Sequence, residues 1–441
     1  MKVRVLRALS ASAVLVVAAA MYPAAVLAAE KGQQPSAKLA KPLHEAQEDL
    51  KAKKYNDAIA KLKEAEGLAG KTPYDQHVIN EFLGNAYINT QNYAEASKVM
   101  EAEVDDGFTP ESEKPQMLRA LTELNTALKN YDKVVEYGNR ALKVEPGNER
   151  MRALVGQAYY LKGDYKNSLK FVENDVDSQI KAGQTPKKDT LLLLYSSCQK
   201  LNDDNCSTHA MEKLVAYYPQ PDYWSQLLGS VRSQTSNNDA DLLQTYRLMT
   251  EVDVLKTPAD YNEMAQLALE AGSPGEAQSV LEKGFQKEVF NDKLTKDRNQ
   301  RLLDNAKKAA ASDQASLPNQ VKEADASSSG QKNVGVGLAF LGYGQYDKAA
   351  DELSKGLTKG GVKDEAQARL LLGIAQLKSG HKDEAVKSFK AVKGDANLER
   401  LASLWSLHAG QPNGAAVSQS AKPKKGTKVS QAQRAARAHG A

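Results

Sequence analysis

Residues 83–96 of this 441-residue chain read LGNAYINTQNYAEA, with two small residues, Gly84 and Ala96, on either side of a short polar turn. Apolar residues recur around this turn at the spacing of a helix face, and aromatic residues stand at Tyr87 and Tyr93. Two helices joined by such a turn pack antiparallel, because a small residue on each lets the two backbones approach closely. The segment therefore predicts a helical hairpin.

The same pattern recurs along the chain. Tyrosines in similar turns follow one another at spacings of 38, 38 and 34 residues, at Tyr55, Tyr93, Tyr131 and Tyr165. Other copies lack the tyrosine but keep the two small residues, as in Ala265 with Ala277 and Gly373 with Ala385. One hairpin cannot bury its apolar face alone, so the copies are expected to stack.

The pattern Leu83-Gly84-x-x-Tyr87…Ala96 resembles the tetratricopeptide repeat family, and Ala141…Pro146 resembles the end of its repeat. The resemblance covers most of residues 40–395 and implies an all-α, right-handed superhelical solenoid of about nine helix-turn-helix units. The unit at 222–252 fits the pattern poorly, and its register is left open. Thr–Pro pairs at 72–73, 109–110, 185–186 and 257–258 are each expected to start a helix.

The chain is expected to divide into six segments. They are a signal peptide at 1–29, a linker at 30–42, an N-terminal repeat array at 43–289, an irregular helix with a Ser-rich linker at 290–332, a C-terminal repeat pair with a capping helix at 333–409, and a disordered basic tail at 410–441.

The N-terminus has the features of an export signal. Lys2, Arg4 and Arg7 precede an uncharged run from Ala8 to Ala29 that ends in small residues. This order is typical of a cleaved secretory signal peptide. An uncleaved anchor is the alternative, because the run is long enough to span a bilayer. We therefore expect an exported bacterial protein of the periplasm.

The net charge of +4 conceals an uneven distribution. Three positive charges lie in the first seven residues and six in the last 32, which leaves 50 basic and 55 acidic residues between them. An acidic body argues against nucleic-acid binding, which needs clustered positive charge. The segment 411–441 is a candidate for peripheral contact with an anionic membrane or polysaccharide, with a purely solubilising tail as the alternative.

No catalytic or metal-binding motif stands out in the sequence. The six histidines are dispersed, and none has a His or Cys partner at the spacing that places two ligands on one helix face. We expect no enzyme activity, no metal and no cofactor, and a function as a scaffold for protein–protein interaction. The alternatives are a structural accessory of an envelope polysaccharide or secretion assembly, tethered by the basic tail, and a hydrolase without a recognisable motif.

The repeat register places the two cysteines, Cys198 and Cys206, across one predicted turn from each other. In an oxidising compartment such thiols are expected to form a disulfide. A redox-active pair, or a metal site that includes His209, is the alternative.

The family resemblance also implies a binding face. In these repeats the first helix of each unit lines the inner, concave face. Carried over to this chain, the face would present a protein partner with Asn85, Asn89, Arg119, Glu123, Gln157 and Tyr160. The alternative is that these are ordinary solvated positions.

Overall fold

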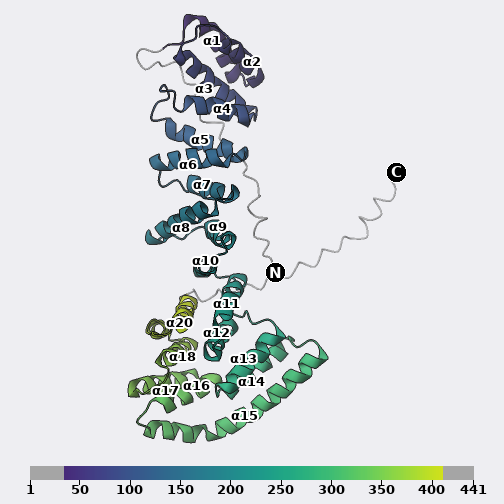
Figure 1. Ribbon diagram of the computed structural model, residues 1–441, viewed down its shortest axis with the longest axis vertical. Helices are drawn as coiled ribbons and strands as arrows, with labels where there is room; N and C mark the ends of the chain where they lie inside the picture. Colours follow the sequence, from purple (N-terminus) through teal and green to yellow (C-terminus); the bar gives the residue numbers. More distant parts are fainter. Residues whose placement is uncertain (1–33, 411–441) are drawn as a thin grey trace, which may run out of the picture. The chain divides into compact units, whose positions relative to one another are not determined.

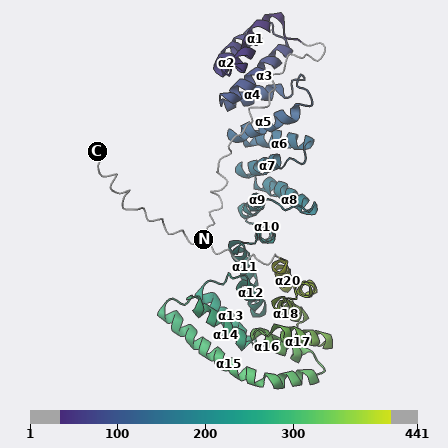
Figure 2. The same ribbon diagram turned by 180° about the vertical axis from the view of Figure 1, so that it is seen from behind.

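The computed structural model describes residues 34–410, which form twenty α-helices and no β-strand (Figures 1 and 2). The expected signal peptide and most of the expected basic tail lie outside the described residues. The helices are α1 (Ala37–Lys51), α2 (Tyr55–Glu66), α3 (Pro73–Asn89), α4 (Tyr93–Glu103), α5 (Lys114–Ala127), α6 (Tyr131–Val144), α7 (Glu149–Leu161), α8 (Tyr165–Lys181), α9 (Lys188–Lys200), α10 (Asp204–Tyr217), α11 (Pro221–Thr235), α12 (Asp239–Glu251), α13 (Pro258–Glu270), α14 (Pro274–Gln286), α15 (Lys293–Ala326), α16 (Gln331–Gly342), α17 (Tyr346–Lys359), α18 (Glu365–Lys378), α19 (Lys382–Lys390) and α20 (Ala396–Ala409).

Consecutive helices form nine hairpins, and only α15 and α20 fall outside them in the described part of the chain. The predicted all-α solenoid of about nine units is therefore confirmed. The poorly matching unit at 222–252 is also a hairpin, made of α11 and α12.

Small residues bring the two helices of a hairpin together, as the sequence indicated. A methyl group added to Gly373 in α18 would lie 2.4 Å from the ring of Phe389 in α19, and one added to Gly337 in α16 would lie 2.6 Å from Leu353 in α17. These contacts leave no room for a larger residue, which explains the glycines at these two positions.

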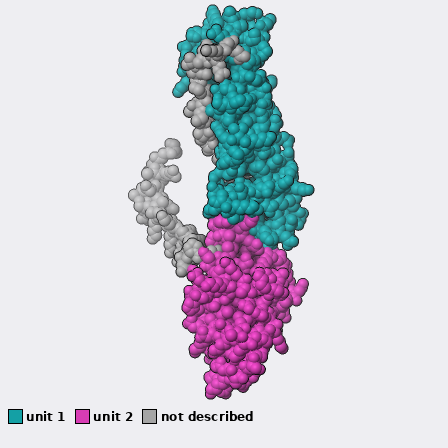
Figure 3. Space-filling view, turned by 90° about the vertical axis from the view of Figure 1, so that its left-hand side faces the viewer, with its two compact units in different colours: residues 1–210 teal, residues 211–441 magenta. Residues whose placement is uncertain are grey.

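The chain divides into two compact units, called unit 1 and unit 2 below (Figure 3). In the sequence, the boundary falls between Ala210 and Met211. The division expected at residues 290–332 is not found there. Most of that segment is the single helix α15, which packs against α14 and α16. Pro318 lies inside α15 without ending it, and the buried Leu317 and Ala324 on either side hold the helix against the core.

Both expected linkers also differ from the structure. The segment at 30–42 includes the start of α1, where Leu39 is buried in the core. The Ser-rich linker is reduced to a short ordered connection after α15. In this connection the Gly330 amide donates to the Gly360 carbonyl at 2.8 Å, and the Ser329 hydroxyl donates to the Gly361 carbonyl at 3.1 Å.

Two of the four Thr–Pro pairs start helices. Thr72 and Thr257 each form a capping box, with Asp75 and Asp260 respectively. The other two pairs lie before α5 and α9, which begin at Lys114 and Lys188. The Thr109 hydroxyl instead donates to the Glu103 carbonyl at 2.9 Å. It therefore supplies a hydrogen-bond partner for a backbone carbonyl at the end of α4 and does not cap a new helix.

The predicted disulfide between Cys198 and Cys206 is confirmed. It joins α9 to α10 with the two Cα atoms 5.5 Å apart, and Cys198 is fully buried. A loop this short is expected to stabilise the hairpin by about 2.5 kcal/mol through the lost entropy of the unfolded chain. The ring of His209, offered as a possible metal ligand, contacts the Asn205 carbonyl at 2.9 Å through Nδ1.

Residues 34–410 contain neither a cluster of metal-binding side chains nor a helix suited to a membrane. No three His, Cys, Asp or Glu side chains are grouped there so as to hold a metal ion. No helix in that range has the length and apolar character needed to cross a membrane.

Candidate functional site

The first helices of the hairpins line the inner face of unit 1. Helix α1 contacts α3, α5 contacts α7, and α7 contacts α9, whereas the second helices of neighbouring hairpins in this unit have no contacts of similar extent among the described residues. Helices on the inside of a curved stack crowd together and those on the outside spread apart. The odd-numbered helices therefore form the inner face, and all six predicted binding residues belong to α3, α5 or α7.

Asn85 and Asn89 lie one turn apart on α3, and both are partly exposed. The Asn89 side-chain amide donates to the Asn85 carbonyl at 2.8 Å and to its side-chain oxygen at 3.1 Å. These bonds fix both side chains on α3. They also leave the Asn85 Nδ2 donor and the Asn89 Oδ1 acceptor without a partner in the described part of the protein. The pair therefore offers one donor and one acceptor, as a peptide backbone does.

Arg119 and Glu123 on α5 both form ion pairs, Arg119 with the residue that ends α6 in its own hairpin and Glu123 with a residue of α7 in the next one. Arg119 forms an ion pair with Glu145, and Arg150 on α7 donates to Glu123 at 2.5 Å. Hydrogen bonds from Asn148 and Arg119 lower the pKa of Glu145. Partly exposed pairs of this kind add little stability, but they neutralise the charges on this part of the inner face.

The burial of Tyr160 on α7 contradicts its expected place on the inner face, whereas the binding role of Gln157 stays a prediction. Gln157 is partly exposed, whereas Tyr160 is buried and meets the ring of Tyr165 edge-on at 5.2 Å between centroids. Burial raises the pKa of its hydroxyl. Tyr160 faces the second helix of its own hairpin, and Leu161, which is 44% exposed, continues the open surface of α7 instead.

A polar and aromatic cluster beside α3 was not predicted from the sequence. The rings of Tyr74, His77 and Phe108 all contact one another, with centroid distances of 5.9 Å for Tyr74–His77, 5.7 Å for His77–Phe108 and 5.5 Å for Tyr74–Phe108. The Nδ1 atom of His77 also contacts Asp106 at 2.8 Å. Asp106 and Phe108 belong to the connection between α4 and α5. The Thr109–Pro110 pair had marked this connection as a helix start, so its packing role was missed.

Glu103, at the end of α4, is the most perturbed acid near this cluster. It is only 2% exposed, and its Oε2 atom has no hydrogen-bond partner among the described residues. Burial, followed by repulsion from Glu81, Asp106 and Glu113, raises the pKa of Glu103 to about 9. Glu103 is therefore a neutral carboxylic acid at pH 7, and it lies close to the inner-face residue Glu81.

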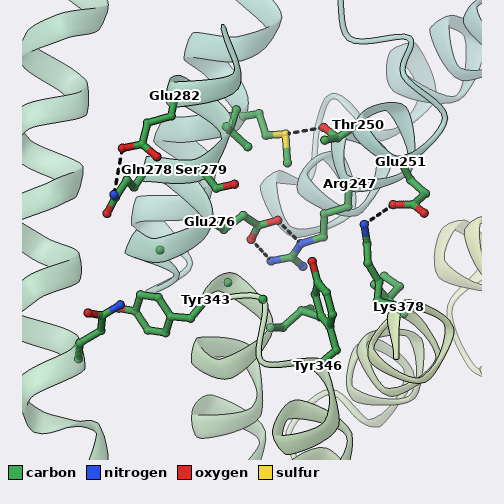
Figure 4. Close-up of a pocket in the computed structure, with 18 of the residues that line it drawn as sticks. Arg247, Thr250, Glu251, Glu276, Gln278, Ser279, Glu282, Tyr343, Tyr346 and Lys378 are labelled. Atoms are coloured by element: carbon green, nitrogen blue, oxygen red, sulfur yellow. Dashed lines mark hydrogen bonds and ion pairs between the residues drawn. The ribbon is translucent and has the colours of Figure 1, made fainter. Parts of the chain in front are cut away.

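Unit 2 contains a polar pocket of about 360 Å³ (Figure 4). It is lined from eight helices of that unit, α12 to α18 and α20, and by the turn after α16. Arg247 is nearly buried at its centre and donates twice to Glu276, from Nε at 2.8 Å and from Nη2 at 2.6 Å. Figure 4 shows Tyr346 beside this pair and Lys378 paired with Glu251.

Most of the charged side chains that line the pocket form ion pairs with one another. Burial alone would raise the pKa of Glu251, but His408 and Lys378 outweigh it and lower this pKa to about 2. Tyr343 points away from the Arg247–Glu276 pair, and its hydroxyl donates to Asp313 at 2.7 Å. The pocket is a network of paired charges that joins distant helices of unit 2, and this arrangement favours a structural role.

Sequence reasoning missed this network because its members are far apart in the chain. Arg247 and Glu276 stand on different hairpins, and each looks like an ordinary charged residue on a helix surface. Arg247 also falls in the 222–252 unit, which matched the repeat pattern least well.

Residues 337–398 match the tetratricopeptide repeat family model. They extend from α16 into α20, so this part of the chain belongs to the tetratricopeptide repeat family, and helical hairpins make up most of the rest of the described chain. Scaffolds of this class bind other proteins. No curated protein matched the sequence.

Solved structures with similarity to this chain include other repeat proteins. The C-terminal part of a TPR repeat-containing protein from Cytophaga hutchinsonii is 14% identical over 60% of this chain and 93% of its own length, with a TM-score of 0.31. A tetratricopeptide repeat protein from Parabacteroides merdae is 14% identical over 66% and 98% of the two chains, with a TM-score of 0.24. The TPR2AB domain of yeast Sti1, in complex with pHSP90, is 14% identical over 68% and 100%, with a TM-score of 0.24.

Proposed function

We propose that the inner face of unit 1 binds an extended segment of a partner protein and that the chain acts as a scaffold without catalysis. The observation that carries this proposal is the Asn85–Asn89 pair, whose side chains are held in place by α3 and still offer one donor and one acceptor. A peptide backbone presents the complementary acceptor and donor at every residue. Gln157, partly exposed on the same face, offers a further amide to the same segment.

The charged residues of this face favour a partner that is recognised through hydrogen bonds rather than through its charge. Arg119 and Glu123 are each paired within the protein. A strongly charged partner would have to break these pairs, whereas an extended polypeptide can bind beside them. Specificity would then come from the side chains that meet the open surface around Leu161.

We expect the double change Asn85→Ala with Asn89→Ala to weaken partner binding about tenfold, since two hydrogen bonds to a partner contribute roughly 0.5–1.5 kcal/mol each. The measurement is crosslinking and affinity capture from intact cells, with the captured partner quantified by mass spectrometry. The matched control changes two exposed asparagines of the outer helices, Asn56→Ala with Asn174→Ala. Equal recovery with both double variants would contradict the proposal.

A second candidate is a tether to an envelope polysaccharide or secretion assembly through residues 411–441, which carry six basic residues and no acid. The same capture experiment separates the two. Partner recovery that survives the two asparagine changes but is lost on deleting 411–441 would favour the tether.

We further propose that the chain is exported to the periplasm through residues 1–29. The disulfide supports this location, because such bonds persist in oxidising compartments and are rare in the cytosol. We expect the protein in a periplasmic fraction, with a mass that lacks the first 28 or 29 residues. Recovery of the full-length mass from the membrane fraction would instead identify residues 8–29 as an anchor.

A further inference from the structure

The pocket of unit 2 lies where the two ends of the unit meet. Helix α20, near the end of unit 2, packs against α12, near its beginning. Trp405 of α20 and Arg247 of α12 both line the pocket, together with residues from the helices between them (Figure 4). The pocket is therefore built only when the whole unit has folded.

The pocket has a buried floor and an opening to solvent. The exposed fraction is 6% or less for four of its most buried residues, which are Arg247, Met264, Ile374 and Trp405. Exposed residues also line it, namely Ser279, Gln314 and Gly344. Its volume of about 360 Å³ falls within the range of small-molecule sites, about 300–1,000 Å³. A small molecule can therefore enter the pocket and be largely enclosed there.

The charges of the pocket argue against an ionic ligand. All five charged side chains that line it already have partners within the protein. They form the pairs Arg247–Glu276, Lys378–Glu251 and Glu282–Lys307. A charged ligand would have to separate one of these pairs and leave the displaced partner without a counter-ion, which costs free energy. The pocket therefore favours a molecule without net charge.

Four neutral polar groups of the pocket have no hydrogen-bond partner in the described part of the chain. They are the hydroxyls of Ser279 and Tyr346, the side-chain amide of Gln314 and the indole N–H of Trp405. Figure 4 shows the Tyr346 hydroxyl directed toward the Arg247–Glu276 pair. Trp405 is only 1% exposed, so leaving its N–H unpaired costs free energy. These groups can donate and accept hydrogen bonds without contributing a charge.

The remaining surface of the pocket is aromatic and apolar. Tyr343, Tyr346 and Trp405 line it, as do the buried Met264 and Ile374. A sugar ring matches this combination, because its hydroxyls both donate and accept at the edge of the ring while its C–H groups can pack on aromatic and apolar surfaces. A purely apolar ligand would leave the four unpaired polar groups without partners.

We infer that this pocket binds a neutral sugar of one or two rings. The hydroxyls of Ser279 and Tyr346 and the Gln314 amide bind hydroxyls of the sugar, and the Trp405 indole supplies a further donor. The ion pairs hold the helices of the wall in position, so they have a structural role while the unpaired neutral groups recognise the ligand. The site lies within unit 2 and does not depend on the inner face proposed for unit 1.

The test is isothermal titration calorimetry of the full chain with five neutral disaccharides: maltose, lactose, cellobiose, trehalose and diacetylchitobiose. We expect at least one of them to bind with a dissociation constant of about 1 mM or lower. Lactobionate, which resembles lactose in size but carries a carboxylate, should bind at least about tenfold more weakly than the best neutral probe, since the pocket offers no unpaired cation. The zwitterionic dipeptide glycylserine should not bind.

Two variants place the sugar in the pocket. Tyr346→Phe removes only an unpaired hydroxyl, so it should preserve the fold and weaken binding about fivefold. Ser279→Phe puts a ring at an exposed position of the wall and should abolish binding by filling the pocket. The matched control is Tyr217→Phe, which removes a partly exposed tyrosine hydroxyl of the same unit outside the pocket and should leave binding at the wild-type level.

Tryptophan fluorescence gives a second measurement of the same site. Trp405 lines the pocket and Trp224 does not. In the Trp224→Phe background, the bound disaccharide should therefore change the emission of the one remaining tryptophan. The change should saturate at the same sugar concentration as the heat of binding.

Three results would each overturn the inference. The first is no binding by any of the five neutral disaccharides, which would leave the pocket with its structural role alone. The second is stronger binding of lactobionate or glycylserine than of the neutral probes, because the pocket would then select charge. The third is sugar binding that is equal in wild type, Tyr346→Phe and Ser279→Phe, which would place the sugar elsewhere on the protein.

Discussion

Arg247→Met is expected to lower the free energy of unfolding of unit 2 by about 3–5 kcal/mol, because it leaves the Glu276 carboxylate in the pocket without its guanidinium partner. The cost comes from the uncompensated charge rather than from the net strength of the ion pair. Both tryptophans, Trp224 and Trp405, belong to unit 2. Urea denaturation followed by tryptophan fluorescence therefore reports the stability of this unit directly.

The double variant Arg247→Met with Glu276→Leu should recover most of this loss, since apolar side chains of similar volume can replace a buried ion pair at little cost. An exposed pair provides the matched comparison. Lys332→Met, which removes the partner of Glu323 at the surface, should cost less than about 1 kcal/mol. A double variant as unstable as Arg247→Met alone would show that packing, and not the buried charge, dominates.

Glu103→Gln is expected to stabilise unit 1 by about 3 kcal/mol at pH 7. The pKa of Glu103 is about 9 in the folded chain and near 4.5 in the unfolded chain, so folding must keep a proton on this group at neutral pH. Stability that is fully present below about pH 4.5 is then lost progressively as the pH rises toward 9. Glutamine resembles the neutral acid in shape and cannot ionise, so the variant should lose this pH dependence.

Unit 1 contains no tryptophan, so hydrogen exchange of the α3–α5 amides at several pH values is the suitable measurement. The difference between Glu103→Gln and wild type should be small at pH 4 and grow steadily up to pH 8. Glu111→Gln, an exposed position in the connection between α4 and α5, is the control and should show no such trend. An equal difference at pH 4 and pH 8 would mean that Glu103 is ionised in the fold.

The hairpins could be predicted from the sequence because their determinants are local. Gly84 with Ala96, or Gly373 with Ala385, encode one turn and one close helix contact within a few residues. The error at 290–332 has a physical cause. Pro318 and the serines before Gly330 are breaking signals in isolation, but the apolar side chains of α15 pack on neighbouring helices and outweigh them.

The candidate sites could be predicted less well from the sequence, because they depend on contacts between hairpins. The family pattern located Asn85 and Asn89 on the inner face, but it could not tell that Tyr160 turns toward Tyr165. Neither the burial of Glu103 nor the pairing of Arg247 with Glu276 can be predicted from the spacing of residues in the sequence. Both depend on which helix surfaces meet.

The contact between α12 and α20 also makes the two units different as folding systems. The contacts described above for unit 1 run between consecutive hairpins, so it can unravel from a free end one hairpin at a time, as repeat arrays do. In unit 2, α20 near the end of the unit packs against α12 near its beginning. Loss of any part of the unit therefore weakens this contact. It should melt in a single cooperative step and fold more slowly, since distant segments must meet before the closing contacts form.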